Sequence, residues 1–378
     1  MVAQRRVRFD LATAADEPAL RELLRRNPMP GAISLSFQTE PDYFRAAAID
    51  GPLQQTIVGR DSRTGAICGM GSRAVRLLYV NGQVTPVGYF SQLRVDRRQE
   101  WGMGLARLVA QGFAMLRELH ADGRTPFYLL SVIEDNHAAR RVLAAGLPGM
   151  PQLVEHARLV TYAIAPRRPM APLAPPAGVR LARGRPEDVP ALLACLDDHG
   201  RRKQFFPAWT AATLFDRALA PGLQPEDFWL AWRGERVVGC LARWNQRTVK
   251  QTVVHAYGGW LGRLRPALNA LRGLHRLPHF PPPGAELRAS FASHLALCED
   301  DPALFAALLR AIYADARTHG DHYFLLGLAA TNPLAATLAP YARLPYASRL
   351  YLAGWEADLP AMASVARQWP VAPEIALL

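Results

Sequence analysis

The chain has 378 residues, half of them hydrophobic, which is long enough for two domains with sizeable cores. Its net charge of +12 comes almost entirely from arginine, since Lys203 and Lys250 are the only lysines. The arginines are spread along the chain, which is typical of a solvated basic surface. We therefore expect no nucleic acid as a partner, whereas anionic ligands stay open.

Nothing in the sequence indicates a metal site, a secretion signal or a membrane span. Cys68, Cys195, Cys240 and Cys298 lie far apart, and none has the spacing of a metal ligand. Residues 1–20 lack the apolar segment of a signal peptide, and no apolar run reaches the roughly 20 residues of a membrane helix. We expect a cytoplasmic protein with free thiols and no metal.

An internal repeat organises the chain. Similar stretches begin at Val7 and at Val179, and each predicts a short strand, a turn and an amphipathic helix with Asp and Pro in its first turn. Five prolines in residues 165–178 predict a linker between the copies. Two further predicted strands recur, residues 65–73 as 236–244 and residues 127–136 as 323–332. The sequence therefore predicts two copies of one α/β unit.

The second copy is longer, and its extra length includes a predicted basic amphipathic helix within residues 258–284. Such a helix packs on its own domain or on a partner, or it lies on a membrane surface, and vesicle co-sedimentation would separate these interpretations. Its apolar face would hold Trp260, Leu261, Leu264, Leu268, Leu271 and Leu274, with Arg263, Arg265 and Arg272 mostly off it.

A glycine pair lies between a predicted strand and a predicted helix, in RVDRRQEWGMGLARLV (residues 94–109). Apolar residues at helical spacing run from Leu105 to Leu119, and the helix is predicted to end near Gly123. A helix N-terminus carries unpaired amides and a positive partial charge, and glycine lets a ligand approach the backbone. The segment predicts an anion site, with an ordinary turn as the alternative.

In the strand predicted before this turn, successive side chains are expected to alternate strictly between the two faces of the sheet. It places Tyr89, Ser91, Leu93 and Val95 on one face and Phe90, Gln92 and Arg94 on the other.

Two common phosphate-binding motifs do not fit the glycine pair. The Walker pattern is absent, and a dinucleotide fingerprint requires a glycine where Arg107 stands. The segment instead resembles the GNAT superfamily of acyl-CoA-dependent N-acetyltransferases. Its Gln/Arg-x-x-Gly-x-Gly/Ala motif fits Gln99, Gly102 and Gly104, and its next motif, Asn-x-x-Ala, fits Asn136 and Ala139.

This resemblance implies an α/β (α+β) fold of two tandem GNAT-like domains, each with a mixed, mostly antiparallel sheet flanked by helices. We expect an acetyl-CoA-binding domain at residues 1–165, a Pro-rich linker at 166–177 and a degenerate second domain at 178–378. Monomer and homodimer are both compatible with a tandem pair.

The resemblance also assigns acetyl-CoA, the implied co-substrate, to named residues. Strand residues 93–95 would hold the pantetheine arm, the amides of residues 98–104 the pyrophosphate, and Arg140 the far end of CoA. Asn136 would contact pantetheine or cap the following helix. The expected cofactor-binding residues are Leu93, Arg94, Val95, Arg98, Gln99, Glu100, Trp101, Gly102, Met103, Gly104, Leu105, Asn136, Ala139 and Arg140.

Acetyl transfer to an amine requires a base for the ammonium, a donor to the oxyanion and a proton for the thiolate. Glu134 and Asp135 end the strand beside the expected thioester, and Tyr89 lies on the preceding strand, so these three are the candidate catalytic residues. An amide of Leu93 or Arg94 is the expected oxyanion donor. The family's acidic Tyr is replaced by Leu143, so the source of that proton stays open. No Ser/His/Asp order indicates a covalent intermediate, and direct transfer is expected.

The second copy lacks the glycines. Glu299, Asp300 and Asp301 stand at the phosphate position, where they would repel a pyrophosphate, so we expect no CoA there. Two functions stay open for the whole chain: an N-acyltransferase with one active copy, for which an acetyl group is the expected acyl group, or a catalytically silent CoA-binding scaffold. The acceptor is a small-molecule amine or a peptide amine.

Overall fold

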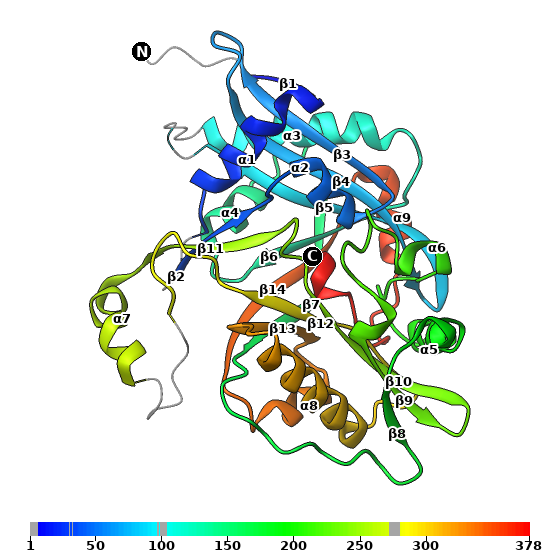
Figure 1. The fold of residues 1–378 in the computed structure, drawn as a ribbon. Helices are drawn as coiled ribbons and strands as arrows, with labels where there is room; N and C mark the ends of the chain where they lie inside the picture. The colour runs from blue at the N-terminus through cyan, green and yellow to red at the C-terminus, as the bar shows by residue number, and fades with distance from the viewer. Residues whose placement is uncertain (1–6, 30, 32, 97, 99–103, 272–279) are drawn as a thin grey trace.

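The computed structural model describes residues 7–29, 31, 33–96, 98, 104–271 and 280–378, shown as a ribbon in Figure 1. The first half contains β1 (Val7–Leu11), α1 (Glu17–Arg26), β2 (Ile33–Gln38), α2 (Tyr43–Ala47), β3 (Leu53–Asp61), β4 (Ile67–Val80), β5 (Gln83–Val95), α3 (Gly104–His120), β6 (Tyr128–Ile133), α4 (His137–Leu143) and β7 (Gln152–Ile164). The second half contains β8 (Arg180–Arg183), α5 (Val189–Gly200), α6 (Ala211–Leu214), β9 (Phe228–Arg233), β10 (Arg236–Trp244), β11 (Gln251–Tyr257), α7 (Gly259–Leu271), β12 (Ala289–Leu297), α8 (Pro302–Thr318), β13 (Tyr323–Ala329), β14 (Arg343–Gly354) and α9 (Leu359–Ala363).

A single 12-stranded sheet runs through both halves, in the order β1-β3-β4-β5-β6-β14-β7-β13-β12-β10-β9-β8. Its ladders are antiparallel except for β5 with β6 and β12 with β13. The predicted mixed α/β class with mostly antiparallel pairing is confirmed. The predicted strands at residues 65–73, 236–244, 127–136 and 323–332 correspond to β4, β10, β6 and β13.

The two halves exchange their last strands. β14 lies between β6 and β7, pairing Ser348–Ala353 with β6 and Arg343–Gly354 with β7. β7 in turn pairs with β13 of the second half. The sequence predicts one sheet per copy, whereas these strands join the two sheets into one.

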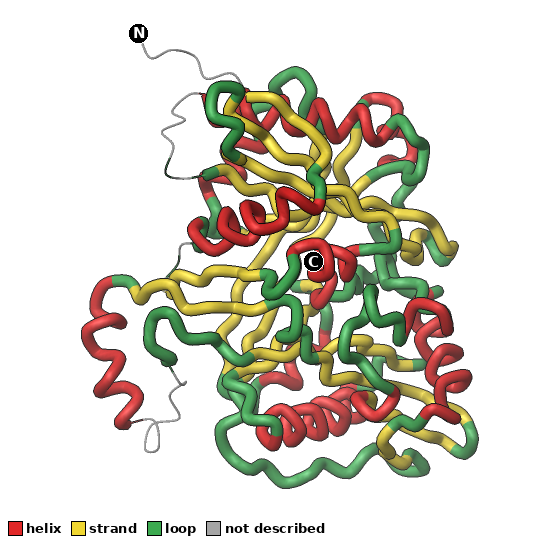
Figure 2. Tube along the Cα trace, turned by 45° about the horizontal axis from the view of Figure 1, so that its top comes forward, coloured by secondary structure: helices red, strands yellow, loops and turns green. Residues whose placement is uncertain are grey.

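Helices cover both faces of this sheet, as the tube in Figure 2 shows. Neighbouring residues of β3 point to opposite faces, so Ile57 packs with Phe113 of α3 and Val58 packs with Leu20 of α1. The second half repeats the arrangement, since Val237 packs on the α5 side and Val238 on the α8 side. Each half of the sheet is therefore buried on both faces.

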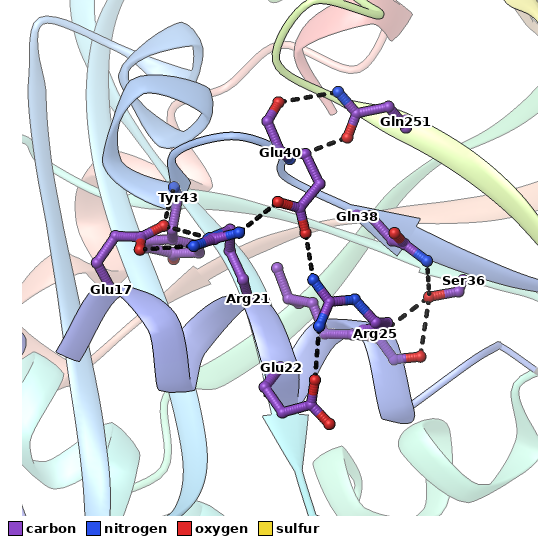
Figure 3. A network of polar contacts seen from close by, with 10 residues as sticks. Glu17, Arg21, Glu22, Arg25, Ser36, Gln38, Glu40, Tyr43 and Gln251 are labelled. Atoms are coloured by element: carbon purple, nitrogen blue, oxygen red, sulfur yellow. Dashed lines mark hydrogen bonds and ion pairs between the residues drawn. The ribbon is translucent and has the colours of Figure 1, made fainter. Parts of the chain in front are cut away.

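A second, two-stranded sheet joins the halves from outside the large one. β2 of the first half pairs with β11 of the second. Figure 3 shows the polar contacts beside it, where Glu40 pairs with Arg21 and Arg25 of α1. The Gln251 side chain both donates to the Glu40 carbonyl and accepts from its amide, each at 2.9 Å. The first helix is thereby connected to the second half.

The predicted basic amphipathic helix is α7, which stands beside the β2–β11 pair at the left of Figure 1. Three residues of its predicted apolar face are exposed, Trp260 by 67%, Leu264 by 48% and Leu271 by 42%. Leu274 and Arg272 lie outside the described residues. Membrane binding by this helix stays a prediction. Within the described part of the chain, no helix is long and apolar enough to span a bilayer.

Candidate active site

β5 and β6 separate after a short parallel ladder, and this opening places the candidate site. The ladder joins Gly88–Phe90 to Tyr128–Leu130 and stops there. Just beyond it, Ser72 of β4 pairs with Ser91 of β5, and Met70 pairs with Arg94. Between these two pairs β5 has one more residue than β4. The extra residue is a β-bulge at Gln92, whose φ is +52°. The backbone therefore turns at the mouth of the opening.

The bulge corrects the predicted face of β5. Strict alternation puts Ser91 and Leu93 on one face, and this prediction is wrong. The Ser91 hydroxyl donates to Asp50 at 2.9 Å on the α2 side, whereas Leu93 packs with Phe90 and Phe113 on the α3 side. The inserted residue shifts the alternation by one, so Leu93 joins the face of Phe90.

A cavity of about 410 Å³ lies mostly on the α3 side of this opening and also reaches the end of α1. Six predicted cofactor-binding residues line it, namely Leu93, Arg94, Val95, Leu105, Asn136 and Ala139. The structure thus brings together residues from β5, α3 and α4 that are separated by up to 46 positions in the chain. Their binding of CoA stays a prediction.

α3 begins beside this cavity. Gly104 is the first residue of α3, and a Cβ built on it meets no atom within 4 Å. Arg98 folds back on the buried Asp96, which it contacts at 3.1 Å, and Asp96 lines the cavity. The predicted pyrophosphate residues Gln99, Glu100, Trp101, Gly102 and Met103 lie outside the described residues.

The second motif forms the opposite wall. Asn136 caps α4, where its side chain accepts from the Ala139 amide at 3.1 Å, and it also lines the cavity. The capping interpretation is therefore confirmed, and the pantetheine interpretation stays a prediction. Leu143, at the position of the family's Tyr, lines the same cavity. Arg140 lines a neighbouring one instead.

The three candidate catalytic residues have different surroundings. The Arg158 guanidinium, 2.9 Å from Glu134, holds the pKa of that carboxyl below its usual value, which makes Glu134 a weaker base. Asp135 is exposed in the turn before α4. Burial raises the pKa of Tyr89 well above its usual value, which keeps its hydroxyl protonated near neutral pH. Tyr89 therefore keeps its proton and cannot act as the base, and its raised pKa also makes it a weaker acid than a free tyrosine.

Asp50 lies beside the bulge on the α2 side and is not among the catalytic residues predicted from the sequence. Asp50 is 6% exposed; its carboxylate accepts from Ser91 and forms an ion pair with Lys250 at 3.0 Å. Lys250 comes from the second half, so both halves build this cluster. Asp50 ends a short 3-10 helix (Ala48–Asp50) and has no motif around it, so only the tertiary fold shows its position.

The second half repeats the bulge and the opening. β12 and β13 pair only over Ala289–Phe291 and Tyr323–Leu325. The register of β12 shifts by one residue around His294, whose φ is +57°. His294 thus matches Gln92, and the two halves share the same local geometry.

The C-terminal segment fills the second opening. The Glu374 carboxylate accepts from the bulge amide of His294 at 2.6 Å. Ile375 lies against β13, so a Cβ built on Gly327 would be 2.6 Å from the Ile375 Cβ. At the N-terminus of α8, Asp301 caps the helix and Asp300 pairs with Lys203 at 2.6 Å. Only about 50 Å³ of cavity is left around this segment.

Burial of these groups predicts opposing effects of pH on stability. Burial lowers the pKa of His294 to about 3 and raises the pKa of Glu374 to about 7. In the unfolded chain, His294 binds a proton below its ordinary pKa of about 6.5, whereas in the folded protein it stays neutral. The free energy of unfolding that His294 contributes is therefore lost as the pH falls below about 6.5. Glu374 binds a proton below about pH 7 in the folded protein, but only near its ordinary pKa of 4.5 in the unfolded chain. Its contribution to the free energy of unfolding therefore rises as the pH falls from about 7 toward 4.5.

Urea unfolding at about pH 7.5 and about pH 5 tests this expectation. The measured quantity is the loss in free energy of unfolding between about pH 7.5 and about pH 5. We expect this loss to be about 2 kcal/mol smaller in His294→Phe than in the unmodified chain. In Glu374→Gln we expect it to be about 2 kcal/mol larger. Each variant is compared with itself at two pH values, so the pH-independent cost of the substitution cancels. Equal pH dependence in all three proteins would show that these groups titrate alike in the folded and unfolded states.

Among the described residues, no group of three His, Cys, Asp or Glu side chains is placed to hold a metal ion. The candidate site is therefore built from a strand opening, a helix N-terminus, a mostly apolar cavity and, across the sheet, a buried carboxylate.

Solved structures share this architecture over nearly the whole chain. A GCN5-related N-acetyltransferase from Sphaerobacter thermophilus matches with a TM-score of 0.52 at 13% identity, covering 92% of this chain and 95% of that one. The chain has the GNAT fold. The N-myristoyltransferase of Saccharomyces cerevisiae with bound myristoyl-CoA matches with a TM-score of 0.60 at 11% identity, covering 93% and 85%.

A conserved protein of unknown function from Enterococcus faecalis, described as a probable N-acyltransferase, matches with a TM-score of 0.50 at 10% identity over 94% of this chain and 74% of that one. No family model and no curated protein sequence matches the chain. The predicted resemblance to the GNAT superfamily is confirmed at the level of the fold.

Proposed function

We propose that the chain is an acyl-CoA-dependent N-acyltransferase whose first half carries the only CoA site. The observation that carries this proposal is the difference between two matching openings. The first opens into a cavity beside the start of α3, whereas in the second the bulge amide already holds Glu374 and only about 50 Å³ of cavity is left. Acetyl-CoA is the donor that the sequence predicts, and the glycine turn would hold its pyrophosphate at the helix N-terminus. The N-acyltransferases that share the fold support this assignment.

The bulge amide is the proposed oxyanion donor. In the second half, the amide of His294 binds the carboxylate oxygen of Glu374, which is negatively charged when ionised. The matching amide of the first half belongs to Gln92, one residue before the predicted Leu93 and Arg94. A backbone N–H fixed by a bulge needs no rearrangement when charge develops on a thioester oxygen.

The acceptor amine is proposed to approach from the α2 side, where Asp50 lies. The CoA cavity is on the opposite face of the sheet, so donor and acceptor would meet at the opening between β5 and β6. Asp50, next to the bulge through Ser91, would take the proton of the ammonium, and direct attack on the thioester would follow. Tyr89, on the Asp50 side of β5, would protonate the leaving thiolate in place of the missing family Tyr.

Amine-dependent release of the CoA thiol tests this function. We expect release from acetyl-CoA or a longer acyl-CoA to require an added primary amine or peptide, and to fall at least about 100-fold in Gly104→Glu. Glu at this position repels the pyrophosphate, yet a negative charge in the first turn favours the helix. Gly104→Ala is the matched control. Thioester binding without release for any amine would favour the silent scaffold.

A further inference from the structure

The cavity beside β5 continues beneath α3, beyond the opening between β5 and β6. Its lining on α3 runs from Leu105 to Leu116, about 16 Å along the helix axis at 1.5 Å per residue. Its far end is reached by Phe9 of β1 and Ile57 of β3, two strands that do not border the opening. An acetyl group at the bulge would leave this part of the cavity empty.

The polar lining is confined to a few positions. Asn27, Arg94, Asp96 and Asn136 come from strand ends, the α1 terminus and the α4 cap, whereas the part beneath α3 is apolar. A pantetheine arm carries amide groups, and an amide buried without a partner costs several kcal/mol. The part beneath α3 therefore suits hydrocarbon and not the CoA arm. Its lining comprises Phe9, Ile57, Gly71, Gly112, Phe113 and Leu116.

Two glycines in the lining let the neighbouring apolar side chains pack closely at this part of the cavity. Gly71 of β4 and Gly112 of α3 both line the cavity, and neither has a positive φ that would require glycine. A Cβ on Gly71 would lie 3.0 Å from Leu93 Cδ2, and one on Gly112 would lie 3.2 Å from Phe9 Cε1. Protein interiors are otherwise close-packed, so an apolar space beneath a helix favours an apolar ligand.

We propose that this cavity holds the acyl chain of a medium- or long-chain acyl-CoA, which makes the chain an N-acyltransferase for fatty acyl groups. The proposal rests on the proposed function, because the acyl chain would enter from a thioester at the bulge. Leu93, directly after the bulge, would be the first side chain along its path. The reaction is unchanged: the amine nitrogen bonds to the thioester carbon, the carbon–sulfur bond breaks, and the thiolate takes a proton.

Calorimetric titration with CoA, acetyl-CoA and octanoyl-CoA tests the proposal on the full chain. Each buried methylene strengthens binding by about fourfold, so octanoyl-CoA is expected to bind at least about 100-fold more tightly than acetyl-CoA. Octanoyl-CoA binding within about threefold of acetyl-CoA would overturn the acyl-chain proposal and leave the proposed function intact. Failure of all three to bind would overturn both.

A substitution that fills the cavity gives an independent test. Val109 lines it one turn after Leu105, and Val109→Phe is expected to reduce octanoyl-CoA affinity at least about tenfold, with CoA affinity changed less than about twofold. Val84→Phe is the matched control, because Val84 is 47% exposed at the other end of β5. Equal losses for CoA and octanoyl-CoA in Val109→Phe would contradict an acyl-chain site. If Val109→Phe does not fold, the chain-length comparison on the unmodified protein still decides.

Discussion

Replacing Asp50 with Asn is expected to lower kcat for acyl transfer by about 100- to 1,000-fold, because a positioned general base contributes about that much. Asn keeps an oxygen that accepts from the Ser91 hydroxyl, yet it cannot take a proton from an ammonium. CoA binding should change less than about twofold, because Asp50 lies across the sheet from the cavity. Steady-state kinetics with a saturating amine, paired with calorimetry, measures both quantities.

Lys250→Met is the control for this experiment. It removes the ion pair of Asp50 and leaves the carboxylate in place, so activity is expected to stay within about tenfold of the unmodified enzyme. If Lys250→Met lost as much activity as Asp50→Asn, the ion pair and not the carboxylate would be required. Full activity in Asp50→Asn would remove Asp50 from the mechanism.

The first half expressed alone, as residues 1–165, is expected not to fold as a soluble monomer. β14 supplies the strand between β6 and β7, and its ladders cover Arg343–Gly354 against β7 and Ser348–Ala353 against β6. Without β14, β6 and β7 would expose unpaired edges beside apolar side chains such as Leu130 and Leu159, which promotes aggregation. Solubility, circular dichroism and size-exclusion chromatography measure the outcome.

Co-expression of residues 1–165 with residues 166–378 supplies the control. We expect the two fragments to associate and recover CoA binding, because all ladders of the sheet are then available. A folded, CoA-binding monomer of residues 1–165 would show that strand exchange is not needed for the first half to fold.

Much of the secondary structure could be predicted because its signals are local. The repeat at Val7 and Val179 marked β1 with α1 and the region of β8 with α5, and glycine and apolar spacing marked α3. The bulge at Gln92 could not be predicted in the same way. A backbone position with positive φ is usually predicted from a glycine in the sequence, and Gln92 gives no such indication.

Long-range features could not be predicted from one sequence. The exchange of β7 and β14 depends on pairing between strands almost 200 residues apart, and each strand alone fits an ordinary unit. Asp50 and Lys250 meet only because β2 and β11 connect the two halves. The acidic run at 299–301 predicted that the second copy has no phosphate site, whereas its filling by Glu374 and Ile375 carries no sequence motif.

The number of CoA sites per chain tests the central claim most directly. Calorimetric titration of CoA into the unmodified protein is predicted to show one site per chain, lost in Gly104→Glu and kept in Glu374→Gln. Two sites, or one site that survives Gly104→Glu, would contradict the assignment of CoA to the first opening alone.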